Sequence, residues 1–120
     1  MASSDTPLKD AGNTHLAAGR LSEALAAYDG ALAAAEGKPA VLHANRAAAL
    51  LRLGRHADAL GAADLALEAD GSYAKALFRR AQALEMLERL GETLVALRRL
   101  LEAEPANKLA EPAPFDGGGC

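Results

Sequence analysis

Apolar and polar positions along the chain follow helical spacing, and the whole pattern recurs after 34 or 35 residues. Gly19 is matched by Gly54, 35 residues later, and Leu32 is matched by Leu67 and then by Leu101. Self-similarity at this period is typical of a stack of small repeated units. The sequence therefore predicts three copies of one unit, which start near Asp5, Ala40 and Ala74.

Helix-breaking residues divide each copy into two helices. Gly19 and Gly54 end the first helix of their copies, and Pro39 suits the first turn of the third helix. Gly71 is expected to close the fourth helix, and Ser72 to cap the fifth. The expected helices span residues 7–18, 22–35, 39 to the break at 54, 56–68, 73–87 and 90–104.

Composition also favours helices. The 120 residues suit one domain, and 51% of them are hydrophobic, but alanine supplies much of this share and aromatic residues only 3%. Ala, Leu, Glu and Arg are strong helix formers, whereas strands draw on Val, Ile and aromatic residues. We therefore predict a single all-α domain.

Charge and cysteine content narrow the possible functions. A net charge of -3 and a pI near 5.6 predict no broad basic surface for nucleic acid or acidic lipid. Cys120 is the only cysteine, so no internal disulfide forms. Residues 1–7 lack the basic start and apolar stretch of a signal peptide, and no apolar run is long enough to span a bilayer. We expect a soluble, cytoplasmic protein.

Small residues recur where paired helices must approach closely: Gly12, Ala24, Ala31, Ala47, Ala59, Ala66 and Ala81. Larger residues are expected to fill the space between layers: Tyr28, Leu32, Leu50, Leu53, Leu67, Leu77 and Leu84. One such unit cannot bury its apolar face alone, so stacked units share a core.

With this period and these positions, residues Pro7 to Lys108 resemble tetratricopeptide (TPR) repeats. The resemblance implies three helix pairs stacked as a short right-handed superhelix, whose first helices line a concave groove. The third repeat departs from the pattern, because Glu88 stands at the usual glycine and Thr93 at the usual alanine. We expect a less tight turn at Glu88.

The resemblance implies an N-terminal tail (1–6), a three-repeat domain (7–108, with repeats near 5–39, 40–73 and 74–107) and a Pro/Gly-rich tail (109–120). TPR domains usually end in an extra helix that covers the last repeat. Here the corresponding segment meets Pro112 and Pro114, so we expect this capping helix to be missing or stunted. Apolar surface on Leu94, Leu97 and Leu101 is then poorly covered, as in a fragment of a longer protein.

Helical spacing indicates which side chains face the implied groove: Lys9, Asn13 and Leu16, then Asn45, Ala48 and Arg52, then Lys75, Arg79, Gln82 and Met86. An acidic protein thus carries a basic groove. Lys75 and Arg79 lie four residues apart on one helix face with no acidic residue between them, and like charges at this spacing repel. The pair makes sense if a ligand brings the negative charge.

Five of these residues resemble the two-carboxylate clamp of co-chaperone TPR domains, which holds the C-terminal Glu-Glu-Val-Asp of heat-shock protein 90 or 70. The resemblance implies that Lys9, Asn13 and Asn45 grip the terminal carboxylate, and that Lys75 and Arg79 hold the aspartate side chain and nearby backbone. Ammonium, guanidinium and amide groups are suitable donors for this task. Leu16, Ala48, Arg52 and Met86 are expected to contact peptide residues upstream of the aspartate.

Three segments, 41–53, 75–90 and 101–108, resemble the N-terminal domain of UCS-type myosin chaperones. The implied function is a monomeric adaptor for a chaperone tail, with myosin as a possible client of a longer protein. The alternative is a TPR scaffold that binds a non-chaperone partner.

Metal and catalytic sites find little support in the sequence. His15, His43 and His56 lie on three different helices, and none has a second ligand three or four residues away. No serine has a plausible base and orienting acid. We expect no cofactor and no enzymatic activity.

Overall fold

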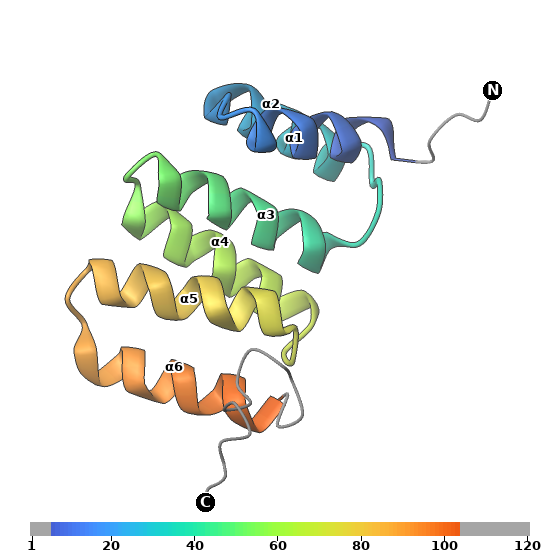
Figure 1. Ribbon diagram of the computed structural model, residues 1–120. Helices are drawn as coiled ribbons and strands as arrows, with labels where there is room; N and C mark the ends of the chain where they lie inside the picture. Colours follow the sequence, from blue (N-terminus) through green and yellow to red (C-terminus); the bar gives the residue numbers. More distant parts are fainter. Residues whose placement is uncertain (1–5, 104–120) are drawn as a thin grey trace, which may run out of the picture.

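Residues 6–103 of the computed structural model form six α-helices joined by short turns (Figure 1). They are α1 (Pro7–Ala17), α2 (Leu21–Ala33), α3 (Pro39–Arg52), α4 (His56–Ala69), α5 (Ala74–Met86) and α6 (Leu90–Ala103). The pairs α1/α2, α3/α4 and α5/α6 follow one another along the stack, with the first and last pairs at opposite ends (Figure 1). The all-α stack of three helix pairs is confirmed, and every expected helix is present.

The two faces of the stack differ in how the helices meet. Helix α3 contacts both α1 and α5, whereas the even-numbered helices of this part of the chain make no comparable contacts with one another. The odd-numbered helices therefore lie side by side on one face, and the even-numbered helices diverge on the other. The first helix of each pair thus contributes to a shared surface.

The expected close-approach positions are all buried. Gly12 shows the reason most clearly, because a Cβ atom added there would lie 2.5 Å from Cε1 of Tyr28. Alanine serves at the equivalent places in the later repeats, Ala47 and Ala81. Small side chains let the paired helices approach, and packing at native density leaves no room for larger ones.

Most of the expected larger core residues are buried as well. Tyr28, Leu50, Leu77 and Leu84 are fully enclosed, and Leu32 and Leu67 are partly buried against the same clusters. The prediction for Leu53 is wrong, since this side chain is 37% exposed. Leu53 follows the last residue of α3, where the chain turns away from the core.

The three turns inside the helix pairs are alike. Gly19, Gly54 and Glu88 adopt positive φ angles of 81°, 80° and 61°. In each turn the N–H of this residue donates to the carbonyl three residues earlier, at 3.1, 3.1 and 2.9 Å. The expected loosening at Glu88 is therefore wrong, because the turn keeps its geometry and Glu88 takes on the strain of a left-handed backbone.

Two further expectations at helix ends are wrong. Ser72 does not cap α5, because its Oγ donates to Oδ1 of Asp70 at 3.2 Å and the helix begins after Tyr73 without a side-chain cap. Gly71 does not close α4 either, since Asp70 already leaves the helix with φ -150° and ψ 99°. Thr93, which replaces the usual alanine, is buried and donates its hydroxyl hydrogen to the Arg89 carbonyl oxygen at 3.0 Å.

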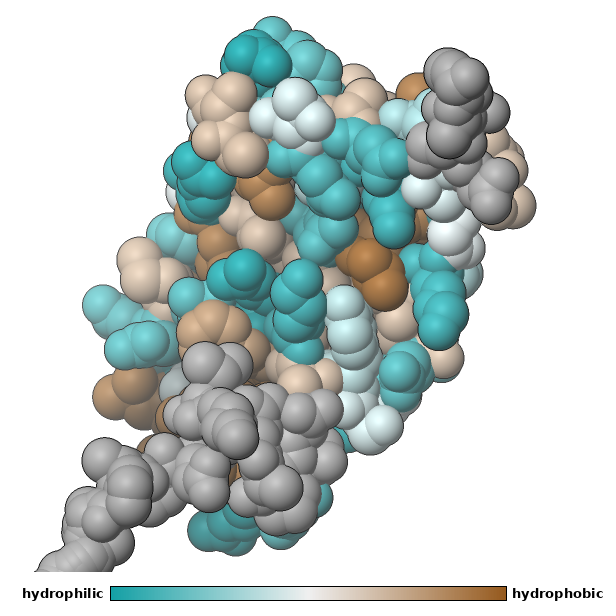
Figure 2. Space-filling view, turned by 45° about the vertical axis from the view of Figure 1, so that its right-hand side comes forward, coloured by the Kyte–Doolittle hydropathy of each residue, from teal (hydrophilic) through white to brown (hydrophobic). Residues whose placement is uncertain are grey.

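The outer side of α6 leaves apolar side chains open to solvent. Leu94, Leu97 and Leu101 are 67%, 40% and 50% exposed, as expected from the sequence. The predicted stub of a capping helix and the Pro/Gly-rich tail lie outside the described residues. On the face seen in Figure 2, hydrophobic side chains form small patches separated by hydrophilic ones.

Candidate functional site

A groove of about 330 Å³ crosses the face formed by the odd-numbered helices. Apolar side chains and charged or polar ones alternate along it. The lining residues come from α1, α3, the start of α4, and α5: Leu16, Ala48, Leu51, Arg52, His56, Arg79, Gln82, Glu85 and Met86. A groove of this mixed character suits a short extended peptide better than a small apolar ligand.

Six side chains expected to face the groove line it: Leu16, Ala48, Arg52, Arg79, Gln82 and Met86. Sequence reasoning missed Leu51, His56 and Glu85. His56 begins α4, the second helix of its pair, and the prediction considered only the first helix of each pair. Glu85 lies three residues after Gln82, and this helical spacing was the available signal.

Asn13 and Asn45, predicted from separate repeats, meet each other but are not among the residues that line the groove itself. Nδ2 of Asn45 donates to Oδ1 of Asn13 at 3.2 Å. The hydroxyl of Tyr28 donates to the same oxygen at 2.6 Å. The tertiary structure therefore joins two amides that lie 32 residues apart in the sequence.

The two lysines are placed by their helices. Lys9 precedes Asn13 by one turn of α1, and its Cδ lies 3.5 Å from where a Cβ on Gly37 would stand. The backbone N–H of Lys9 donates to Oε1 of Glu36 at 3.2 Å. Lys75 precedes Arg79 by one turn of α5 and is exposed. Neither lysine is among the residues that line the groove itself.

Arg79 is the most enclosed cation of the groove. Burial lowers the pKa of its guanidinium, which remains charged at neutral pH. Its Nη1 donates to Oε1 of Gln82 at 2.8 Å, and the guanidinium carbon lies 5.5 Å from the centroid of the Phe78 ring. Arg52 likewise uses a neutral acceptor, the carbonyl oxygen of Leu16, at 2.9 Å. Within residues 6–103, neither guanidinium forms an ion pair, although Glu85 also lines the groove.

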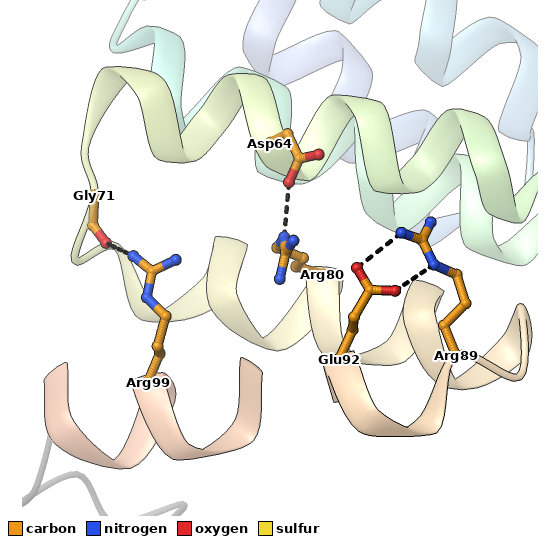
Figure 3. Close-up of polar contacts among 6 residues, drawn as sticks. All are labelled: Asp64, Gly71, Arg80, Arg89, Glu92 and Arg99. Atoms are coloured by element: carbon orange, nitrogen blue, oxygen red, sulfur yellow. Dashed lines mark hydrogen bonds and ion pairs between the residues drawn. The ribbon is translucent and has the colours of Figure 1, made fainter. Parts of the chain in front are cut away.

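Several arginines elsewhere in residues 6–103 form ion pairs with carboxylates, whereas Arg20 donates to His15 and Arg99 donates to the Gly71 carbonyl oxygen. Arg46 pairs with Asp29 and Arg80 with Asp64, each at 2.8 Å. Figure 3 shows the Arg80–Asp64 pair and the pair between Arg89 and Glu92. Within residues 6–103, ion pairs also join Arg55 to Asp58, and none involves Lys9, Arg52, Lys75 or Arg79.

The three histidines belong to three different helices. Nδ1 of His15 accepts a hydrogen bond from Nε of Arg20 at 2.8 Å, and His43 is partly buried on α3. Across the described residues, no three His, Cys, Asp or Glu side chains come together as metal ligands. No helix of residues 6–103 has the length and apolar character needed to cross a membrane.

Known proteins resemble this chain along most of its length. It is 36% identical over 103 residues to protein unc-45 homolog B of Xenopus tropicalis, a match that covers 84% of this chain and 11% of that protein. The chain therefore spans about a ninth of the length of this curated relative. No family model matches the chain.

Two solved structures share both sequence and fold with the chain. The first TPR of Spaghetti (RPAP3), bound to the HSP90 peptide SRMEEVD, is 38% identical with a TM-score of 0.79, and the match covers 84% of this chain and 79% of that one. The second TPR domain of human RPAP3, in complex with the HSP70 peptide SGPTIEEVD, is 37% identical with a TM-score of 0.76, over 84% and 83%. With this identity over most of two solved TPR domains, the chain belongs to the tetratricopeptide-repeat family.

Proposed function

We propose that this domain is a co-chaperone adaptor that binds the acidic C-terminal Glu-Glu-Val-Asp tail of heat-shock protein 90 or 70. Lys9, Asn13 and Asn45 grip the terminal carboxylate. Lys75 and Arg79 hold the aspartate side chain and the adjoining backbone. Charge-assisted hydrogen bonds of this kind are about twice as strong as neutral ones, which suits recognition of a short peptide.

The observation that carries the proposal is the absence of acidic partners for the groove cations within residues 6–103. Positive side chains on one face repel one another, and in this part of the chain no carboxylate forms an ion pair with Lys9, Arg52, Lys75 or Arg79 as Asp29 and Asp64 do with Arg46 and Arg80. A ligand with two carboxylates at its end supplies the missing charge.

The solved relatives support the same ligand class. RPAP3 domains were solved with two peptides whose sequences both end in Glu-Glu-Val-Asp. In this chain, Leu16, Ala48, Arg52 and Met86 line the groove beside Arg79. We assign them to the peptide residues that precede the terminal aspartate, where the two chaperone tails differ.

The proposal describes a binding module without a catalytic step, acting as a monomer in the cytoplasm, with the domain bounded at residues 7 and 108. Similarity to unc-45 homolog B, and to the solved UNC-45 chaperone that binds and folds muscle myosin, makes a myosin chaperone a candidate for a longer protein of which this domain is one part. Folding of myosin itself is not assigned to these residues.

Calorimetric titration with an acidic peptide that ends in Glu-Glu-Val-Asp tests the proposal, with the C-terminus either free or amidated. We expect a Kd in the micromolar range, about -8 kcal/mol, for the free acid only. Affinity should fall as salt is raised, because the anchoring charges are screened. Equal binding of both peptides, or of neither, would leave a TPR scaffold whose partner is not a chaperone tail.

A further inference from the structure

We propose that Tyr28 is a positioning residue that holds the Asn13 amide in the orientation needed to donate to a peptide carboxylate. This inference rests on the proposed function. Tyr28 belongs to α2, which is not a groove-lining helix, and its ring is fully buried. Its hydroxyl donates to Oδ1 of Asn13, an exposed residue of α1, at 2.6 Å.

The amide oxygen of Asn13 is doubly occupied. It accepts one hydrogen bond from Tyr28 and a second, at 3.2 Å, from Nδ2 of Asn45. A carbonyl oxygen has two lone pairs, so both acceptor positions are used. The NH₂ group at the other end of the same amide therefore points away from this pair, on a side chain that remains exposed.

The orientation matters because the two ends of an amide have opposite character. The NH₂ end donates to a carboxylate, whereas the oxygen end repels it. Turning the Asn13 amide by half a rotation would remove the acceptor of Tyr28 and set two NH₂ groups against each other. Burial raises the pKa of Tyr28 to about 12, so its hydroxyl keeps its proton at physiological pH.

The first repeat is built to let Tyr28 reach Asn13. The Tyr28 ring packs on Gly12, where any Cβ would collide with it. The later repeats carry Ala47 with Ala63 and Ala81 with Leu97 at the equivalent places, so neither offers a hydroxyl. The combination of Gly12 and Tyr28 occurs in the repeat that holds Asn13. If the ring served packing alone, there would be no reason for a hydroxyl in this repeat.

The test compares Tyr28→Phe with Tyr73→Phe, a matched loss of a hydroxyl at a turn outside the groove lining. Both are titrated with the free-acid and amidated peptides. Tyr28→Phe should weaken free-acid binding about 10-fold, since a neutral hydrogen bond of ordinary strength no longer fixes the amide. Binding of the amidated peptide should not change, so discrimination between the two peptides falls. Tyr73→Phe should behave as the unmutated protein.

A double-mutant cycle separates positioning from packing. In an Asn13→Ala background, Tyr28→Phe should cost no further affinity, because the group that it positions is gone. Independent, additive losses would overturn the inference, as would full free-acid affinity in Tyr28→Phe. If the unmutated protein itself fails to prefer the free acid, the proposed function fails instead.

The unmutated protein offers a second measurement that does not depend on the folding of a variant. In spectra of side-chain amides, the Asn13 NH₂ protons should shift strongly downfield on addition of the free-acid peptide and stay in place with the amidated one. Unmoved Asn13 protons during saturating free-acid binding would contradict the inference.

Discussion

Two arginines on the outer face of this domain and two on its groove face differ in the groups to which they donate hydrogen bonds. On the outer face, Arg46 and Arg80 each meet an aspartate of the preceding helix at 2.8 Å. On the groove face, within residues 6–103, Arg52 and Arg79 donate to neutral oxygens and form no ion pair. Arg79 and Arg80 are neighbours in the sequence, yet within residues 6–103 Arg80 forms an ion pair and Arg79 does not. Within residues 6–103, the proposed binding face therefore has two arginines that form no ion pair, while these two outer arginines each form one.

The outer ion pairs follow the repeat. Asp29 and Asp64 are 35 residues apart, and Arg46 and Arg80 are 34 apart. Each pair joins the second helix of one repeat to the first helix of the next, as Figure 3 shows for Asp64 and Arg80. These charges serve the stacking of repeats, and partly exposed pairs of this kind contribute at most about 1 kcal/mol each.

The difference between the two faces is tested most directly by replacing each of the two adjacent arginines, Arg79 and Arg80. Arg79→Ala should reduce free-acid peptide affinity by about 2–5 kcal/mol, because the peptide carboxylate loses its enclosed partner. Arg80→Ala should leave affinity unchanged and lower the melting temperature slightly. Calorimetric titration and thermal melting of both variants check this. Equal loss of affinity in the two would show that overall charge, and not the groove, captures the peptide.

The layer between the two faces can be disturbed at Gly12. Gly12→Ala should cost about 1–3 kcal/mol of unfolding free energy, since the new Cβ would lie 2.5 Å from Tyr28 Cε1 and must displace the ring. Gly61→Ala is the matched control, because a Cβ there meets nothing within 4 Å. Alanine also favours a helix interior, so this control should gain stability. Urea denaturation measures both, and similar changes in the two would refute the contact.

The turns inside the helix pairs can be altered at Glu88 and Gly54, because neither residue lines the groove. Glu88→Gly should stabilise the protein by about 1 kcal/mol, because glycine adopts φ 61° without the strain that a side chain brings. Gly54→Ala, at φ 80°, should destabilise it by a similar amount. Peptide affinity should stay constant in both. A destabilised Glu88→Gly variant would mean that this side chain stabilises the turn.

His43 should produce the smallest effect. Burial and the nearby Arg46 lower its pKa from 6.5, against the opposing charges of Asp29 and Glu68. The unfolded chain therefore takes up a proton that the folded state resists, and stability is lost as the pH falls below about 6.5. His43→Leu should flatten this acid-side slope in urea denaturation, and His15→Gln should keep it. An unchanged slope in His43→Leu would assign the effect to another group.

Much of the candidate site could be predicted from helical spacing within one repeat. Spacing placed Arg52, Arg79 and Met86 on the groove face correctly, because residues three and four apart share a face of a helix. His56 was missed because it begins α4, a second helix, and only the packing of the helices brings it to the groove. Its place in the groove depends on contacts between helices, which one helix does not encode, whereas Glu85 could have been found from its spacing after Gln82.

The sequence alone determined the repeat period, the helix pairs and the small residues between them, because these depend on local propensity and on periodic burial. The tertiary structure decided the rest. It set Glu88 in a left-handed backbone conformation and exposed Leu53 at the end of α3. It also brought the donors of Tyr28 and Asn45 to the side-chain oxygen of Asn13. The physical reason is that each of these outcomes depends on which atoms of distant residues meet, and such meetings are settled only when the helices stack.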